Sequence, residues 1–345
     1  MGGVPVDKHL TIEEAKSMMK KLSSELKGTL HWGDDDAFNL EKLPLGMPSL
    51  DAAMNGGFAF DRIALVVGEF STGKTLIAMM AIKAAQAKGL STAFIDVEKT
   101  WTPEWAAQLG IRPNDVLVLR ARTGEDAFNG ALKLVKLKMP VIVIDSLAAM
   151  VAAKELAPDE DEMLQQQFMG GATASMIGRG LKLLNEENNG SLIICINQLR
   201  EKPGVVYGNP ETSPGGKAPG FYAWHTLRVR RGPFIEENGV RVGYHMKITV
   251  TKNKQGAPFR EADISFYYSG EFDEITGLVE QALDVGVIMQ KASSYTFQRL
   301  DTETGELSTQ KVIGRKNLVE AIKVDPRLRA WFEAEVTSAV GRVDL

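Results

Sequence analysis

The chain has 345 residues, and its content of 44% hydrophobic and 24% charged residues is typical of globular proteins. Lysine plus arginine (40) falls short of aspartate plus glutamate (44), so the net charge of −4 excludes an overall basic coat but leaves room for a local basic site. The single cysteine excludes a disulfide framework, and the length predicts about two domains. Because no apolar run reaches the ~18 residues of a membrane span and the chain opens without a signal peptide, we expect a cytoplasmic protein with no membrane partner.

A lone amphipathic helix is predicted ahead of the main fold. Thr11 followed three residues later by Glu14 matches a capping box, and apolar residues then recur at helical spacing from Ile12 to Leu26. The apolar face of this helix must be covered, either by its own domain or by a neighbouring subunit.

From Asp61 onwards, short apolar runs alternate with helical stretches such as Lys74–Ala87. Such an alternation indicates a mostly parallel sheet covered on both faces. The predicted strands are Arg62–Val67, Ser91–Asp96, Val116–Leu119, Val141–Asp145 and Leu192–Asn197.

After Trp224 the apolar period shortens to two, and Asn238-Gly239 predicts a hairpin turn. The segments Lys247–Thr251 and Ala262–Tyr268 extend the sheet in antiparallel fashion. A smaller unit then follows, with a helix over Leu278–Leu283, a hairpin around residues 303–305 and two helical stretches after Gly314. We therefore divide the chain into residues 1–42, 43–272 and 273–345.

The segment 68–75 matches the phosphate-binding pattern G-x-x-x-x-G-K-[ST] between a predicted strand and a predicted helix. Its backbone N–H groups would hold the phosphates of a nucleotide, Lys74 would reach the β- and γ-phosphates, and Thr75 would be a ligand of Mg²⁺. The loop residues are Gly68, Glu69, Phe70, Ser71, Thr72, Gly73, Lys74 and Thr75.

Two acidic residues follow predicted strands. The run 141–144 delivers Asp145 to the Mg²⁺ shell, unless it is a plain aspartate at a strand end. Glu98 follows the strand that ends at Asp96, and it could orient or deprotonate a water molecule, unless it is a solvated loop residue. The residues alone thus indicate an ATPase or GTPase.

The segment 198–220 is rich in glycine and proline, and we expect it to be a loop without secondary structure. Between Leu199 and Gly232 there are six basic and two acidic residues, which gives a local charge of +4. This charge suits a nucleic-acid backbone, although a solvated lid over the nucleotide would explain it as well.

The same region resembles the second DNA-binding loop of the bacterial RecA recombinase family. The residues that carry the resemblance are Asn197-Gln198-Leu199-Arg200, Gly208–Thr212 with Gly215-Gly216, and Phe221-Tyr222-Ala223. The phosphate loop, segments 95–98 and 143–146, Lys252-Asn253-Lys254 and 257–259 follow in the order of the family, from about Leu43 to Val287. The resemblance implies an α/β fold: a RecA-type P-loop NTPase core with a mostly parallel central sheet, an N-terminal helix and a small C-terminal α/β domain.

Residue roles follow from the resemblance. Glu98 would activate water, and Gln198 would sense the γ-phosphate of ATP. Lys252 and Lys254 would reach the nucleotide of the adjacent subunit, and Phe221 would project across the same interface.

Trp105 would stack on adenine, although ordinary helix packing would also explain it. The residues that the resemblance places on DNA are Arg200, Asn209, Gly215, Gly216 and Lys217 of the second loop, with Met169 and Gly170 of the first loop.

Four departures from the family are visible. Gly220 stands where the family commonly has a lysine, Thr102 replaces an acid near adenine, and four acids (159–162) enter the first loop. The chain also ends at Leu345 without an acidic tail. These differences suggest a divergent member, of phage or plasmid origin.

The expected function is ATP-dependent homologous recombination: a helical filament on single-stranded DNA that pairs with homologous double-stranded DNA and hydrolyses ATP with Mg²⁺. Further partners would be a single-strand-binding protein or a recombination mediator. Two alternatives stay open, namely a hexameric ring motor of the same core fold and a nucleotide-gated DNA-binding regulator.

Overall fold

The computed structural model describes residues 11–25, 30–155, 171–201, 211–300 and 307–343. The chain divides into two compact units, Met1–Glu41 and Lys42–Leu345. The first unit contains helix α1 (Ile12–Glu25) and the short 3₁₀ helix η1 (Asp36–Phe38). The predicted capping box is confirmed, because the Thr11 N–H donates to the Glu14 carboxylate at 2.9 Å and the Glu14 N–H donates to Thr11 Oγ1 at 3.3 Å.

The second unit contains the strands β1 (Lys42–Leu43), β2 (Phe58–Ala59), β3 (Ile63–Gly68), β4 (Thr92–Asp96), β5 (Val116–Arg120), β6 (Val141–Asp145), β7 (Leu192–Gln198), β8 (Arg200–Glu201), β9 (Glu211–Thr212), β10 (His225–Glu237), β11 (Val240–Asn253), β12 (Arg260–Tyr267), β13 (Phe272–Asp273), β14 (Met289–Lys291), β15 (Ser294–Leu300) and β16 (Leu307–Ile313). Its α-helices are α2 (Pro48–Ala53), α3 (Lys74–Ala87), α4 (Pro103–Gln108), α5 (Gly124–Lys136), α6 (Ala172–Glu187), α7 (Ala218–Tyr222), α8 (Glu274–Asp284), α9 (Arg315–Val324) and α10 (Pro326–Val343). The 3₁₀ helices are η2 (Pro113–Asp115), η3 (Leu147–Ala149) and η4 (Ala153–Glu155). No helix of the described segments is long and apolar enough to cross a membrane.

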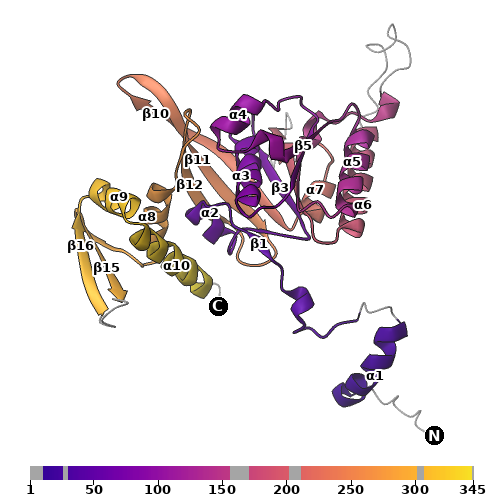
Figure 1. Cartoon of the computed structure of the whole chain (residues 1–345), viewed down its shortest axis with the longest axis horizontal. Helices are drawn as coiled ribbons and strands as arrows, with labels where there is room; N and C mark the ends of the chain where they lie inside the picture. Colours follow the sequence, from indigo (N-terminus) through magenta and orange to yellow (C-terminus); the bar gives the residue numbers. More distant parts are fainter. Residues whose placement is uncertain (1–10, 26–29, 156–170, 202–210, 301–306, 344–345) are drawn as a thin grey trace, which may run out of the picture. The chain divides into compact units, whose positions relative to one another are not determined.

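A nine-stranded sheet forms the centre of this unit, in the order β13-β12-β11-β10-β3-β7-β6-β4-β5 (Figure 1). The strands from β10 to β5 run parallel to one another, whereas β11, β12 and β13 add an antiparallel extension. The predicted α/β fold with a mostly parallel sheet is therefore confirmed.

The strands β3, β4, β6 and β7 are buried on both faces, as their apolar runs predict. The predicted cover of both faces was wrong for the edge strand β5, where only Val116 is buried. On β3, Ala64 and Val66 join the hydrophobic cluster that includes α3, whereas Ile63, Leu65 and Val67 join the cluster that includes α5 and α6. This division follows from the period of two along a strand. The predicted strand ends differ from the observed ones by a residue or two.

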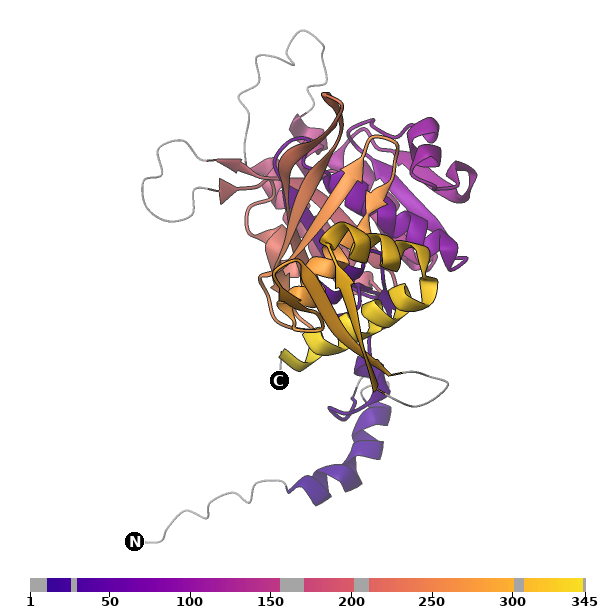
Figure 2. The ribbon, with the colours of Figure 1, turned by 90° about the vertical axis from the view of Figure 1, so that its left-hand side faces the viewer.

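The long ribbon of β10 and β11 turns at the predicted position (Figure 2). Asn238 and Gly239 have φ angles of 51° and 79°, as a two-residue hairpin turn with left-handed backbone requires.

The C-terminal residues form a second, smaller layered structure. Strands β14, β15 and β16 make an antiparallel sheet, and Phe297 of this sheet contacts Phe332 of α10 with ring centroids 4.8 Å apart. The tip of the predicted hairpin (303–305) lies outside the described residues, but its two strands are β15 and β16, paired at Leu300 and Leu307. The three-part domain division stays a prediction.

The expectation that segment 198–220 lacks secondary structure was wrong for its described part. Strands β8 and β9 pair, with Arg200 opposite Thr212, and helix α7 begins at Ala218. Glycine and proline do not prevent either element, because the ribbon needs only two residues a side and Pro219 stands in the first turn of α7, where proline is tolerated.

Candidate functional site

The phosphate loop leaves the sheet at Gly68, the last residue of β3, and ends where α3 begins at Lys74. A Cβ atom on Gly68 would lie 2.4 Å from the carbonyl oxygen of Val229, because β10 runs alongside. Gly73, at φ 98°, precedes the helix, and there a Cβ atom would lie 2.4 Å from Met246 Sδ. Both positions therefore require glycine, and the loop leads into a helix N-terminus suited to an anion.

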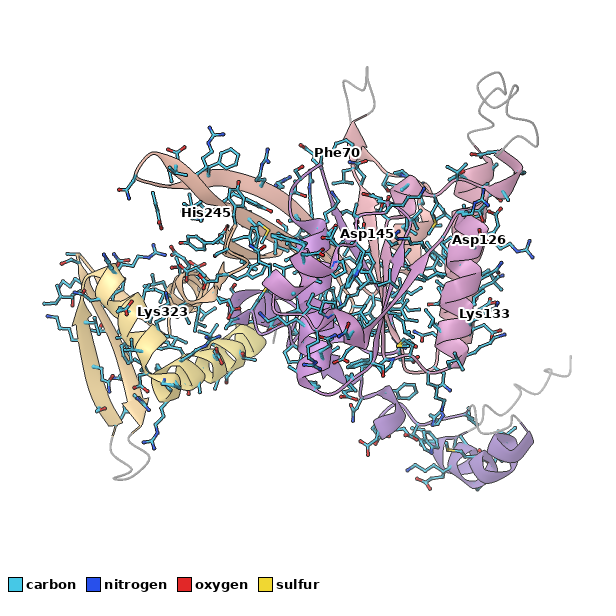
Figure 3. The ribbon with its side chains drawn as sticks, turned by 45° about the horizontal axis from the view of Figure 1, so that its top comes forward. Phe70, Asp126, Lys133, Asp145, His245 and Lys323 are labelled. Carbon is cyan, nitrogen blue, oxygen red and sulfur yellow. The ribbon has the colours of Figure 1, made fainter. Side chains whose placement is uncertain are left out.

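Two side chains of the loop lie over its backbone. The Lys74 ammonium donates to the Glu69 carbonyl at 2.5 Å, and Thr72 Oγ1 donates to the same carbonyl at 3.1 Å. Burial lowers the pKa of Lys74, while Asp145, Glu98 and Glu69 oppose that shift. Phe70 is different, since 77% of it is exposed and it lies at the rim of the unit, whereas Asp145 lies inside (Figure 3).

Thr75 and Asp145 come together across two elements. Thr75 Oγ1, on α3, donates to Asp145 Oδ2, at the end of β6, at 2.8 Å. Asp145 is only 1% exposed, and burial raises the pKa of its carboxyl to about 7. A buried carboxylate beside a hydroxyl is the oxygen donor set that Mg²⁺ takes next to a phosphate, so these residues fit the predicted metal.

Glu98 lies next to this pair. The backbone carbonyl of Asp145 accepts the N–H groups of Val97 at 2.8 Å and Glu98 at 3.2 Å. The Ser146 hydroxyl donates to the Glu98 carboxylate. Ser146 ends segment 143–146, and no role was predicted for it from the sequence; its position directly after Asp145 was the available signal.

Gln198 ends β7 directly beside the phosphate loop, because it pairs with Gly68 in the parallel register. The next N–H group, that of Leu199, donates to the Gly68 carbonyl at 3.1 Å. Asn197 Nδ2 donates to the carbonyl of Pro214 at 2.9 Å. One strand end therefore contacts both the phosphate loop and Pro214, in the second half of segment 198–220.

Lys252 and Phe221 lie together at another edge of the sheet. Lys252 Nζ donates to the carbonyls of Gly220 at 2.6 Å and Phe221 at 3.1 Å. Burial and the charge of Lys254 lower the pKa of Lys252. The Lys254 ammonium lies 5.4 Å from the ring centroid of Trp224, and Phe221 is 72% exposed.

The strand register shows which edge this is. On β10, His225 pairs with Ala64 of β3 and, on its other side, with Asn253 of β11, whereas Val229 pairs with Gly68. The two lysines thus lie beside the start of β3 and the phosphate loop lies at its end. Four residues of strand separate the two levels by about 13 Å.

Trp105 of α4 is half-buried, and its ring meets Phe266 edge to face at 6.2 Å. One side of the indole is therefore used in packing, and its stacking on adenine stays a prediction.

The described DNA-contact candidates lie together around β9 and α7. Gly215 and Gly216 have φ angles of 84° and 61°, and the exposed Lys217 caps α7. Arg200 begins β8. Asn209, Met169, Gly170 and the acids 159–162 lie outside the described residues.

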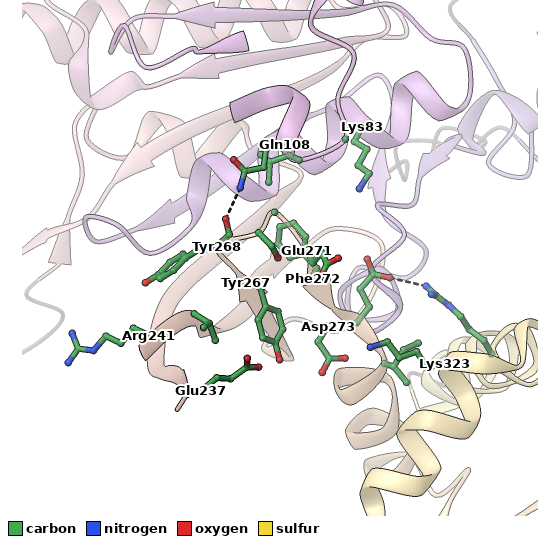
Figure 4. Close-up of a pocket in the computed structure, with 18 residues that line it drawn as sticks. Lys83, Gln108, Glu237, Arg241, Tyr267, Tyr268, Glu271, Phe272, Asp273 and Lys323 are labelled. Atoms are coloured by element: carbon green, nitrogen blue, oxygen red, sulfur yellow. Dashed lines mark hydrogen bonds and ion pairs between the residues drawn. The ribbon is translucent and has the colours of Figure 1, made fainter. Parts of the chain in front are cut away.

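A cavity of about 1030 Å³ lies elsewhere, between α4, the outer strands and the C-terminal helices (Figure 4). Arg329 of α10 donates there to Glu274 of α8 at 2.8 Å. The walls carry both signs of charge, among them Lys83, Lys323 and Glu271, and none of the phosphate-loop residues. Because no phosphate-loop residue lines this cavity, we place the candidate nucleotide site at the loop and not in the cavity.

A strand, a glycine loop and a helix, with a buried aspartate from a neighbouring strand on the loop threonine, define a P-loop nucleotide-binding protein. The family model described as the RecA N-terminal domain matches residues 12–273. The chain is 33% identical over 341 residues to Protein RecA of Frankia casuarinae, covering 97% of this chain and 94% of that protein. It is 35% identical over 341 residues to Protein RecA of Thermus thermophilus, with 96% and 95% covered.

The chain belongs to the RecA family. Proteins of this family bind ATP and DNA and act in DNA recombination and repair.

Proposed function

We propose that this chain is an Mg²⁺-dependent, DNA-stimulated ATPase that assembles head to tail into a helical filament on single-stranded DNA and exchanges strands with homologous double-stranded DNA. The observation that carries the proposal is the separation of two half-sites. The phosphate loop stands at one edge of the sheet, and Lys252, Lys254 and Phe221 stand at the opposite edge. In one chain they cannot meet, but the lysines of one copy can reach the nucleotide of the next.

Each residue then has a definite task. Loop N–H groups and Lys74 bind the phosphates, and Thr75 with Asp145 would hold Mg²⁺, which supplies positive charge to the β- and γ-phosphates when bound. Glu98 takes the proton of the attacking water. Lys252 and Lys254 of the neighbouring copy stabilise charge that develops on the leaving phosphates.

Engagement of Lys252 with a neighbouring nucleotide has a cost. Its two bonds to the α7 carbonyls must be given up or shared, and each bond to a charged group is worth about 1.5–3 kcal/mol. The carbonyls that lose Lys252 belong to α7, which directly follows Lys217 of the proposed DNA-binding loop. Formation of the composite site would therefore disturb the end of the DNA-binding loop.

Two surfaces support assembly with further copies. Strand β5 is an edge strand, and its Leu117, Val118 and Leu119 are 58%, 37% and 36% exposed. Unpaired apolar edges favour pairing with another chain. The apolar face of α1 is a second candidate surface, and we propose that a neighbouring subunit covers it.

The decisive experiment measures phosphate release with and without single-stranded DNA, with negative-stain images of the same samples. We expect hydrolysis to rise on DNA addition, and helical filaments with ATP. Closed rings would favour the ring motor, and DNA binding without stimulated hydrolysis would favour the regulator.

A further inference from the structure

The side chain of Glu98 is exposed, but the residues that contact it are buried. The residue is exposed and stands two positions beyond the end of β4. A free glutamate at such a position samples many rotamers, and selecting one of them costs side-chain entropy. A general base needs a fixed place with respect to the attacking water. The neighbours of Glu98 therefore decide how well it can act.

The turn beneath Glu98 is closed by Asp96. This aspartate is fully buried, and its carboxylate accepts the N–H groups of Thr100 at 2.9 Å and Trp101 at 3.2 Å. Arg120 Nε approaches the same carboxylate at 3.9 Å. Trp101 is itself buried and packs on Phe94, with ring centroids 5.0 Å apart. The backbone on both sides of Glu98 is thus fixed to the core.

The side chain is held from the adjacent strand. The Asp145 carbonyl accepts the N–H of Glu98, and the next residue, Ser146, donates its hydroxyl to the Glu98 carboxylate. Ser146 is only 2% exposed, so water competes little for its hydroxyl. Backbone and side chain of Glu98 are therefore attached to consecutive residues of one segment, the same segment that carries the Mg²⁺ ligand Asp145.

We infer that Ser146 is a positioning residue, whose hydroxyl fixes the carboxylate of Glu98 beside the phosphate loop on the turn that Asp96 closes. The inference rests on the proposed function, in which Glu98 activates water. Ser146 does not touch the nucleotide in this scheme. Its contribution is geometric, because a misplacement of about 1 Å can cost about 10²-fold in rate.

The test is Ser146→Ala in the full chain with DNA and ATP. We expect kcat to fall by about 10- to 100-fold, with KM for ATP and nucleotide affinity unchanged. Ser146→Thr, which keeps the hydroxyl, should recover most of the loss. Ser191→Ala is the matched control, because Ser191 is also buried and its hydroxyl has no partner among the described residues. Amide hydrogen exchange of segment 97–101 should quicken in Ser146→Ala and not in Ser191→Ala.

A double-mutant cycle with Glu98→Gln separates the two claims. If Ser146 acts through Glu98, Ser146→Ala should cost almost nothing further in the Glu98→Gln background. Full additivity, or an unchanged kcat in Ser146→Ala while Glu98→Gln is slow, overturns the positioning role alone. Wild-type turnover in Glu98→Gln overturns the proposed base, and the inference with it.

Discussion

In the proposed function, the two edges of the central sheet bind the same nucleotide by opposite means. At the phosphate-loop edge, backbone amides and buried groups make the site, with Asp145 only 1% exposed. At the lysine edge, Lys252 and Lys254 are long side chains whose partners are backbone carbonyls and an indole ring. At the first edge Thr75 and Asp145 are already in contact, whereas in the proposed assembly Lys252 at the second edge must exchange partners. Binding strength should therefore depend on the first edge, and control of turnover on the second.

The largest effect is expected at the lysine edge. A Lys252→Ala/Lys254→Ala chain should keep its nucleotide affinity, because in the proposed assembly the lysines act on the neighbouring site, while DNA-stimulated hydrolysis falls by about 10³-fold or more, as for other cations supplied in trans. Phosphate release and nucleotide titration measure the two quantities.

Mixing that chain with a Lys74→Ala chain provides the control. Interfaces that pair an intact phosphate loop with intact lysines should regain part of the activity. No recovery at any ratio, in samples shown to contain mixed filaments, would contradict the composite site.

At the phosphate-loop edge, Lys74→Ala should weaken ATP binding by about 10²-fold, since the lost charge-assisted bonds are worth about 3 kcal/mol. The affinity for a fluorescent ATP analogue measures this loss. Lys83→Ala is the control, because Lys83 is an exposed lysine of the same helix α3, farther along the helix from the phosphate loop. Equal affinities for Lys74→Ala and the wild-type chain would show that the charge of Lys74 does not contribute to ATP binding.

Gln198→Ala tests the connection from the loop edge to DNA. Allosteric factors between two ligands are typically about 5- to 150-fold and are reciprocal. We expect the variant to bind DNA with ADP as the wild-type chain does, while the gain on replacing ADP by an ATP analogue shrinks towards one. DNA titrations with both nucleotides, across a salt series, measure this. Arg200→Ala should instead weaken DNA binding in both states and flatten its salt dependence. An undiminished ATP gain in Gln198→Ala would assign the signal to another route.

The smallest effect is expected from His225, which lies at the lysine edge, and it concerns the stability of the fold. Burial, with the charge of Lys42, lowers the pKa of this histidine to about 4, so the folded state binds its proton less readily than the unfolded state, where the pKa is about 6.5. The free energy of unfolding should therefore decrease by about 2 kcal/mol as the pH falls from 7 to 5 on account of His225. His225→Asn should flatten that slope in denaturant titrations. Parallel slopes for the variant and the wild-type chain would contradict the assignment.

The sequence predicted the features that depend on local pattern. The two-face burial of Ile63–Val67 follows from alternation, and the loop between β3 and α3 follows from its glycines and lysine. Neither needs knowledge of distant contacts. The capping box of α1 and the Asn238-Gly239 turn belong to the same class.

What the sequence did not predict depends on contacts between distant segments. Ser146 and Glu98 are 48 positions apart, and no periodicity connects them. Nor could composition reveal that Lys252 donates to the carbonyls at 220 and 221, because that bond depends on where β11 ends beside α7. The pairing of β8 with β9 in the glycine-rich segment 198–220 likewise depends on contacts that the local sequence pattern does not show.

Strand β10 has one further consequence, because two of its residues stand beside different proposed half-sites: Val229 next to Gly68, and His225 next to Asn253. An assembly built by joining one half-site to the other has no twofold axis, so its two tips differ. One terminal copy would offer a phosphate loop without lysines, and the other would offer lysines without a nucleotide to contact. The terminal copy whose phosphate loop lacks the lysines would not hydrolyse ATP. Subunits would therefore join and leave the two ends of the assembly at different rates. The direction of growth along DNA would then be set within each chain, by the course of a single strand.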